Sequence, residues 1–166
     1  MPQLKKQITW QEALIKMESM CAGSEYCEYE INTRLVKLGI KADKRREIIN
    51  HLIENRFIDN ERFSLSFARD KARFSYWGPY KIQHALASLR ISSATINKAI
   101  NGVEQQNWED ALLKNASSKA RTLNLIAPAK EGYDNRKKLF LYLIGRGFSS
   151  QDSNRAVKIM REKQLE

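Results

Sequence analysis

The chain is poor in the residues that cross-link small folds or interrupt helices. Its 166 residues include two cysteines, three prolines and seven glycines. Two cysteines are too few for the disulfide framework of a small secreted domain, so we expect Cys21 and Cys27 to be reduced thiols. This cysteine content favours a cytoplasmic protein.

The sequence also lacks a long apolar run. No segment approaches the roughly eighteen apolar residues that a membrane-spanning helix needs. Residues 1–6 contain two lysines, but no apolar stretch follows them, so this segment does not resemble a signal peptide. We therefore expect the protein to have no membrane partner.

Motifs of catalysis are missing as well. The sequence has no glycine-rich dinucleotide loop, no Walker loop, no His-Glu-x-x-His and no Gly-x-Ser-x-Gly. His51 and His84 could form a four-ligand zinc site with the two cysteines, but their spacing matches no zinc-ligand pattern. We expect His51 to be a half-exposed surface residue instead.

Acidic residues do not form a convincing metal site either. Glu25, Glu28 and Glu30 cluster in what would be the first turns of one helix. Carboxylates at that place interact favourably with the helix dipole, and this is a commoner cause of such a cluster than metal binding. We therefore expect no metal, no cofactor and no enzymatic activity.

What the sequence does contain is one apolar pattern in three copies. When the copies are aligned on Ile40, Ile91 and Phe148, apolar residues recur nine and five positions before each anchor and nine and twelve positions after it. These residues are Ile31, Leu35, Ile49 and Leu52, then Ile82, Leu86, Ile100 and Val103, then Leu139, Leu143, Val157 and Met160. Such self-similarity predicts tandem repeats that bury apolar faces against their neighbours.

Helical signals occur along almost the whole chain, and no convincing strand pattern occurs. The expected N-caps and first helical positions are the Thr9–Glu12 capping box, Ser24, Asp59 or Asn60, Pro79, Ser92 or Ser93, and Ser149. The sequence thus predicts an all-α protein, an elongated tandem array of three-helix repeats with three modules and about nine helices. From helix spacings of 8–10 Å, we expect an array of roughly 60–80 Å.

The repeat and the turn residues suggest a division of the chain. We predict an N-terminal helix in residues 1–23, a first repeat in 24–76 and a second in 77–127. A linker containing Pro128 and Gly132 would occupy 128–133, and a third repeat of two helices 134–166. The third repeat would lack its last helix, unless the N-terminal helix supplies that element at the other end.

Positive charge dominates the middle of the chain. Lysine and arginine number 29 against 19 acidic residues, which gives a net charge of +10. Seven bases between residues 62 and 101 stand against one acid, Asp70. Because a strongly basic protein tends to bind polyanions, we take these bases as candidate binding residues. They are Arg62, Arg69, Lys71, Arg73, Lys81, Arg90 and Lys98.

The arginines of this set lie on one face of a predicted helix. Those within residues 62–73 recur at spacings of seven and four, and Phe63, Phe67 and Phe74 are expected on the opposite, core side. The next residues include Trp77 beside Lys81, a combination that suits base stacking and phosphate contact. Alternatively, the bases only solvate helix faces and the aromatic residues pack between repeats.

Three-helix units with a short middle helix are also typical of helix-turn-helix proteins. A helix that reads bases needs side chains such as Arg, Asn or Gln near its N-terminus. The corresponding residues are Lys44, Arg45 and Arg46, then Thr95, Asn97 and Lys98, then Gln151, Ser153 and Asn154. They share no reading face, so a basic helical protein that acts directly on nucleic acid is the alternative function.

Three further motifs are Leu35-x-x-Leu38-Gly39-Ile40, residues 57–63 followed by Ser66-Phe67-Ala68-Arg69, and Trp77-Gly78-x-x-Lys81-Ile82. With these motifs the chain resembles the RecX family of regulators of the bacterial recombinase RecA, over residues 17–163. The second repeat departs from the others at Arg90, which stands where Gly39 and Gly147 stand.

The resemblance implies a curved, elongated and non-catalytic protein. Its implied partner is the RecA–DNA filament, whose recombinase and coprotease activities it would mostly inhibit, in the setting of DNA repair, recombination and the SOS response. Weak DNA binding without sequence preference would accompany this contact. We expect a monomer in the cytoplasm.

Overall fold

The computed structural model describes residues 8–166, and this part of the chain contains nine α-helices and no strand. The expected all-α fold is thereby confirmed. The helices are α1 (Trp10–Gly23), α2 (Glu28–Lys37), α3 (Ala42–Glu54), α4 (Asn60–Ser75), α5 (Pro79–Ser88), α6 (Ser93–Asn101), α7 (Gln105–Ala120), α8 (Ala129–Gly145) and α9 (Ser150–Glu162). The signal-peptide prediction for residues 1–6 lies outside the described residues.

Most helices begin where the sequence predicts. The expected side-chain caps are present at Thr9 of α1, Asp59 of α4, Ser92 of α6 and Ser149 of α9, and Pro79 is the first residue of α5. The prediction of a cap at Ser24 is wrong. Instead, α2 begins after Cys27, whose backbone N–H donates to the Glu30 carboxylate at 3.2 Å.

The three copies of the apolar pattern face the apolar clusters as the repeat predicts, and only Ile49, Ile100 and Val157 are partly exposed. The anchors Ile40, Ile91 and Phe148 are 7%, 6% and 4% exposed. Each anchor donates its N–H to the carbonyl five residues earlier, on Leu35, Leu86 and Leu143. The residue before each anchor has a positive φ: 76° at Gly39, 59° at Arg90 and 92° at Gly147. The same left-handed turn therefore closes the first helix of every copy.

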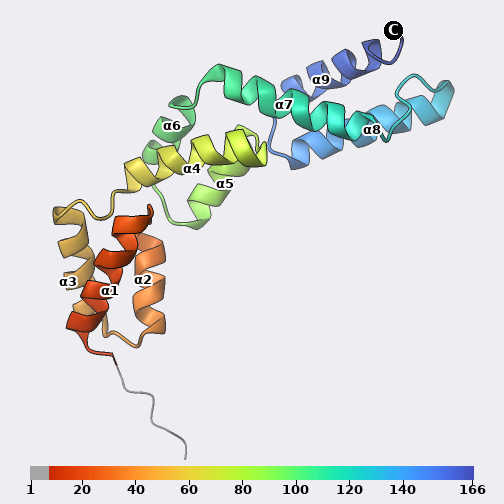
Figure 1. The fold of residues 1–166 in the computed structure, drawn as a ribbon. Helices are drawn as coiled ribbons and strands as arrows, with labels where there is room; N and C mark the ends of the chain where they lie inside the picture. Colours follow the sequence, from red (N-terminus) through yellow and green to blue (C-terminus); the bar gives the residue numbers. More distant parts are fainter. Residues whose placement is uncertain (1–7) are drawn as a thin grey trace, which may run out of the picture.

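The helices pack in three consecutive groups. One apolar cluster is built from α1–α3, a second mainly from α4–α6 and a third mainly from α7–α9. Figure 1 shows these groups, which we call units one, two and three, following one another in an elongated arrangement. Each unit begins one helix earlier than the corresponding repeat predicted from the sequence. The predicted repeat boundaries at residues 24, 77 and 134 stay a prediction.

Two local predictions are wrong. Residues 129–133 are not an irregular linker, because they form the first turns of α8, with Gly132 buried. The chain reverses before them, where Gln164 accepts from the Leu125 N–H at 2.8 Å and donates to the carbonyl of Leu123 at 2.9 Å. The second error concerns Phe74, whose spacing predicts a core position but which is 69% exposed.

Units two and three meet at a close crossing of two backbones. The N–H groups of Gly78 and Tyr80, at the start of α5, donate to the carbonyls of Arg146 and Gly147 after the end of α8, at 2.8 and 3.0 Å. The unpaired donors of one helix terminus thus satisfy the unpaired acceptors of another. A side chain at Gly78 or Gly147 would overlap with the opposite backbone. Only glycine allows this approach.

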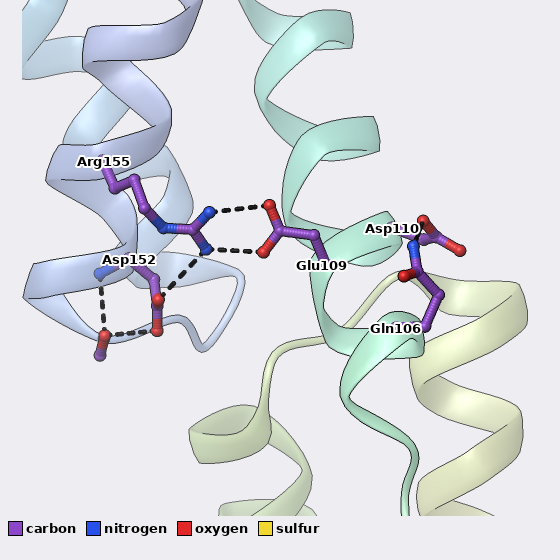
Figure 2. A network of polar contacts seen from close by, with 6 residues as sticks. Gln106, Glu109, Asp110, Asp152 and Arg155 are labelled. Atoms are coloured by element: carbon purple, nitrogen blue, oxygen red, sulfur yellow. Dashed lines mark hydrogen bonds and ion pairs between the residues drawn. The ribbon is translucent and has the colours of Figure 1, made fainter.

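A charged contact holds α7 against α9 within unit three. Figure 2 shows Arg155 of α9 donating to both carboxylate oxygens of Glu109 on α7, at 2.7 and 2.6 Å, with Asp152 as a third acceptor. The hydrogen bond from Arg155 lowers the pKa of Glu109. This contact therefore stabilises the fold at neutral pH, and its contribution is lost as the pH falls through the lowered pKa.

Replacement of Gly147 by alanine tests the crossing. The new methyl group would overlap with the Lys81 backbone nitrogen at a residue with φ +92°, so we expect a loss of about 2 kcal/mol or more in the free energy of unfolding. Urea unfolding followed by circular dichroism measures it. Gly145→Ala is the matched control, because its Cβ would meet no atom within 4 Å. Equal stability of the two variants would contradict this account.

Candidate polyanion-binding surfaces

The seven candidate bases lie in different environments in the structure. Two of them are neutralised by carboxylates that lie outside their own helices. Arg62 at the start of α4 donates to Glu25 at 2.6 Å, and Lys98 on α6 contacts Glu61 at 2.7 Å. The hydrogen bond with Glu25 raises the pKa of Arg62. These two side chains are therefore positioned by the fold and are the weakest candidates for a ligand.

Arg62 belongs to the junction between units one and two. Beside it, Asn60 and Glu28 exchange two hydrogen bonds, of 3.1 Å from the Glu28 N–H to the Asn60 side chain and 2.8 Å in return. Cys27 and Tyr29 pack against the apolar cluster of unit two. The junction thus combines a few apolar contacts with exposed polar bonds, in contrast to the backbone crossing between units two and three.

Lys71 and Lys81 meet at one aromatic ring. Their Nζ atoms lie 5.1 and 4.7 Å from the centre of the Trp77 ring, although the residues come from α4 and α5. Trp77 is partly buried against the cluster of unit two, so its place is fixed by packing. Among residues 8–166, no carboxylate lies within ion-pair distance of either lysine. Two ammonium groups are thus held together without neutralisation, an arrangement that favours an anionic ligand.

Arg69 and Arg73 line a different surface, the groove between α4 and α7. This groove has a volume of about 1040 Å³ and also receives Lys114 from α7. Its lining includes the acids Asp70, Glu104 and Asp110, so the three cations face three carboxylates. The groove is therefore polar and electrically balanced, and less suited to a polyanion than the surface around Trp77.

Arg90 occupies the left-handed turn between α5 and α6. Its guanidinium carbon lies 5.0 Å from the centre of the Tyr29 ring on α2, which links unit two to unit one. A non-glycine residue in this conformation costs roughly 1–2 kcal/mol. The contact with Tyr29 offsets part of this cost, since a cation over an aromatic ring contributes about 0.5–1 kcal/mol or more.

Sequence reasoning missed two side chains of these surfaces. Lys114 joins Arg69 and Arg73 only because α7 packs along α4, a contact between residues about forty positions apart that no local pattern reveals. Helical spacing from Phe63 and Phe67 places Phe74 in the core. It lies instead beside Arg73, 5.4 Å from ring centre to guanidinium carbon, and adds an exposed aromatic face to the groove.

Side chains that could bind a metal or act as nucleophiles do not form a further candidate site among the described residues. No cluster of three or more His, Cys, Asp or Glu residues that could hold a metal ion occurs among the described residues. Burial raises the pKa of Cys27 to about 11 and also raises the pKa of Cys21. Both thiols are therefore protonated at neutral pH and unreactive. Within residues 8–166, no helix is long and apolar enough to cross a membrane.

The fold and these surfaces define a helical repeat protein whose basic residues are displayed on the outside of consecutive three-helix units. Residues 59–100, which include α4, α5 and most of α6, match the family model described as RecX, second three-helix domain. In this stretch the chain is therefore similar to the RecX family.

Curated proteins and a solved structure are also similar to the chain. Regulatory protein RecX of Clostridium botulinum (strain Alaska E43 / Type E3) is 24% identical over 121 residues, 73% of this chain and 55% of that protein. Regulatory protein RecX of Lactobacillus johnsonii is 28% identical over 83 residues, 50% of this chain and 31% of that protein. The chain thus spans about half the length of the Clostridium relative and a smaller share of the Lactobacillus one. The crystal structure of RecX from Lactobacillus salivarius has a TM-score of 0.76 at 18% identity and covers 91% of this chain and 96% of its own.

Two substitutions at Arg90 distinguish the effect of its strained backbone from the effect of its side-chain contact with Tyr29. Arg90→Gly and Arg90→Ala both remove the contact with Tyr29, but only alanine keeps the unfavourable left-handed conformation. We expect the glycine variant to be more stable than the alanine variant by about 1 kcal/mol in urea unfolding. An alanine variant as stable as the glycine variant would show that the turn is not strained. Equal decreases in ligand affinity in the two variants would identify the guanidinium as a binding group.

Proposed function

We propose that this protein is a non-catalytic regulator that binds a RecA–DNA filament and mostly inhibits its recombinase and coprotease activities. The resemblance to the RecX family supports a recombinase as the partner, and the names of the curated relatives, regulatory protein RecX, support a regulatory role. The observation that carries the proposal is the pair of unneutralised lysines at Trp77, set on an elongated helical array. This partner places the protein in the cytoplasm, where it would act as a monomer.

An elongated shape suits a partner that is itself a filament. An array of three units can contact neighbouring protomers at once, and contacts in series bind more tightly than any one of them alone. A protein bound to several protomers restrains their movement, because its contacts with the protomers must break before the protomers can shift. Lys71 and Lys81 would reach the DNA phosphates of the filament. Phosphate contacts are independent of sequence, which suits a protein that must act anywhere along a filament.

Direct binding to nucleic acid is the second candidate function. Tyr80 favours it, since this ring is 53% exposed next to Lys81 and could stack on a base. The helix-turn-helix form of this function has less support in unit two. There the Thr95 hydroxyl accepts from Ser92 at 2.9 Å and Lys98 is paired with Glu61, so two of its candidate readers are engaged within the protein.

Charge reversal at Arg69, Arg73 and Lys81 tests the basic surfaces. We expect the triple glutamate variant to bind recombinase-coated single-stranded DNA at least about tenfold more weakly, because attractions become repulsions. Each single reversal should change affinity much less, since exposed ion pairs contribute about 0–1 kcal/mol. Fluorescence anisotropy over a range of salt concentrations measures the affinity and its dependence on salt. The slope of log affinity against log salt should become shallower by about 0.7 for each phosphate that the variant no longer neutralises.

The matched control reverses three exposed lysines away from these surfaces, Lys16, Lys37 and Lys158. It changes the net charge equally and should retain most of the affinity. If the triple variant keeps its helicity, binding and inhibition, these side chains have no part in the mechanism, and Arg136, Lys137 and Lys138 become the next candidates. A preference for one duplex sequence on bare DNA would favour the second function. Hydrolysis of ATP by the purified protein alone would contradict the non-catalytic assignment.

A further inference from the structure

Helix α8 presents an apolar stripe to the outside of unit three. Tyr133, Leu141 and Ile144 are 60%, 55% and 36% exposed, and with Lys137 they recur at spacings of four, four and three residues, which places them on one face. The opposite face carries Leu139 and Leu143, which are fully buried. The stripe extends over twelve residues, 133–144, and its ends are about 17 Å apart along the helix. It is a second apolar face of α8, unlike the single face expected of a helix that packs only within its own protein.

The stripe is bordered by two grooves that lie along α8. The first, of about 420 Å³, runs between α8 and α9, where Phe140 and Val157 form its apolar wall and Lys137 contributes a charge. The second, of about 500 Å³, continues past Ile144 to Tyr80 on α5. Both surfaces are concave and largely apolar, so together they can accept a rod-shaped ligand about three helical turns in length.

The charges along both grooves have one sign. The basic side chains that line them are Arg136, Lys137, Lys81 and His84, and no described residue lining either groove is an aspartate or a glutamate. This is unlike the balanced groove between α4 and α7. A ligand for the α8 surface should therefore combine apolar side chains with acidic ones.

We propose that the stripe and grooves of α8 dock a protein segment, namely an acidic amphipathic helix of a recombinase protomer, while the lysines at Trp77 contact the DNA of the same filament. The inference rests on the proposed function, because it names the protein component of that filament as the occupant. Lys81 lines the second groove and also lies over Trp77, so the protein-binding and DNA-binding surfaces meet at this residue.

Other occupants fit the surface less well. A second copy of this chain would bring Lys137 and Arg136 against the same cations of its neighbour, and such like-charge contacts oppose association. Single-stranded nucleic acid binds by stacking on aromatic faces, whereas the middle of this surface, at Leu141 and Ile144, is aliphatic. A lipid surface requires a protruding apolar face, whereas this one is hollowed by two grooves.

The double variant Leu141→Asp/Ile144→Asp tests the inference. Both side chains are exposed, so the fold should survive, which circular dichroism checks. We expect its affinity for recombinase-coated single-stranded DNA to fall about tenfold or more, as for removal of a central apolar anchor, while affinity for the bare strand changes less than twofold. Lys137→Glu should likewise weaken binding to the coated strand and leave binding to the bare strand unchanged. The control is Val36→Asp/Ile53→Asp, which makes the same change at 51% and 41% exposed residues of unit one and should have no such effect.

The outcomes separate the inference from the proposed function. If the wild-type protein does not prefer the coated strand, the proposed function fails and the inference with it. If the wild type prefers the coated strand but the double aspartate variant does so equally, only the α8 surface is excluded. A wild-type dimer in sedimentation analysis that the variant converts to monomer would assign the face to a second copy. Binding to vesicles of phosphatidylglycerol and phosphatidylcholine that the variant abolishes, with filament binding unchanged, would assign it to lipid.

Discussion

The backbone crossing of Gly78 and Gly147 is the constraint on which the shape and the surfaces of the molecule depend. It joins the start of α5 to the end of α8 through two main-chain hydrogen bonds, and neither position has room for a side chain. Polar side chains complete the joint. Asn115 of α7, 5% exposed, donates to the Tyr76 carbonyl at 2.7 Å and accepts from the Tyr142 hydroxyl at 3.2 Å, while the Arg146 guanidinium donates to the carbonyls of Ser75 and Tyr76. Because these buried polar groups are hydrogen-bonded across the joint, units two and three are fixed relative to each other.

The junction of units one and two has a different character. Its ion pair joins Arg62 and Glu25, whose side chains are 41% and 36% exposed, and the amide of Asn60 bonds to Glu28 at the surface. Exposed ion pairs contribute little and are screened by salt. Movement between these units therefore costs less than movement across the glycine crossing. A rigid pair of units with a more adaptable third can follow a curved partner without changing the geometry of its main contact surfaces.

The sequence was informative where a signal is local or periodic. The apolar repeat located the buried anchors, and it aligned Arg90 with Gly39 and Gly147, with which it shares a left-handed turn in the structure. The failures concern tertiary context. Gly132 resembles a linker residue, yet it lies in α8, where a Cβ would overlap with the carbonyl of a residue before the helix. Likewise, the bases of residues 62–101 suggested one basic strip, but acids that offset them, Glu25, Glu61 and Glu104, lie outside that stretch. Charge counted along a segment therefore overstates the charge that the folded surface presents.

The Trp77 pair shows what remains after this neutralisation. Lys71 and Lys81 come from two helices joined by the turn that ends at Gly78, and the crossing with Gly147 fixes that turn. The same crossing places Lys81 at the end of the groove along α8. A single backbone contact therefore sets the distance between the lysine pair, proposed to bind anions, and the apolar surface along α8. If the two surfaces bind the DNA and the protein of one filament, a shift at this crossing would weaken both together, whereas breaking the ion pair at the junction of units one and two would leave their spacing unchanged.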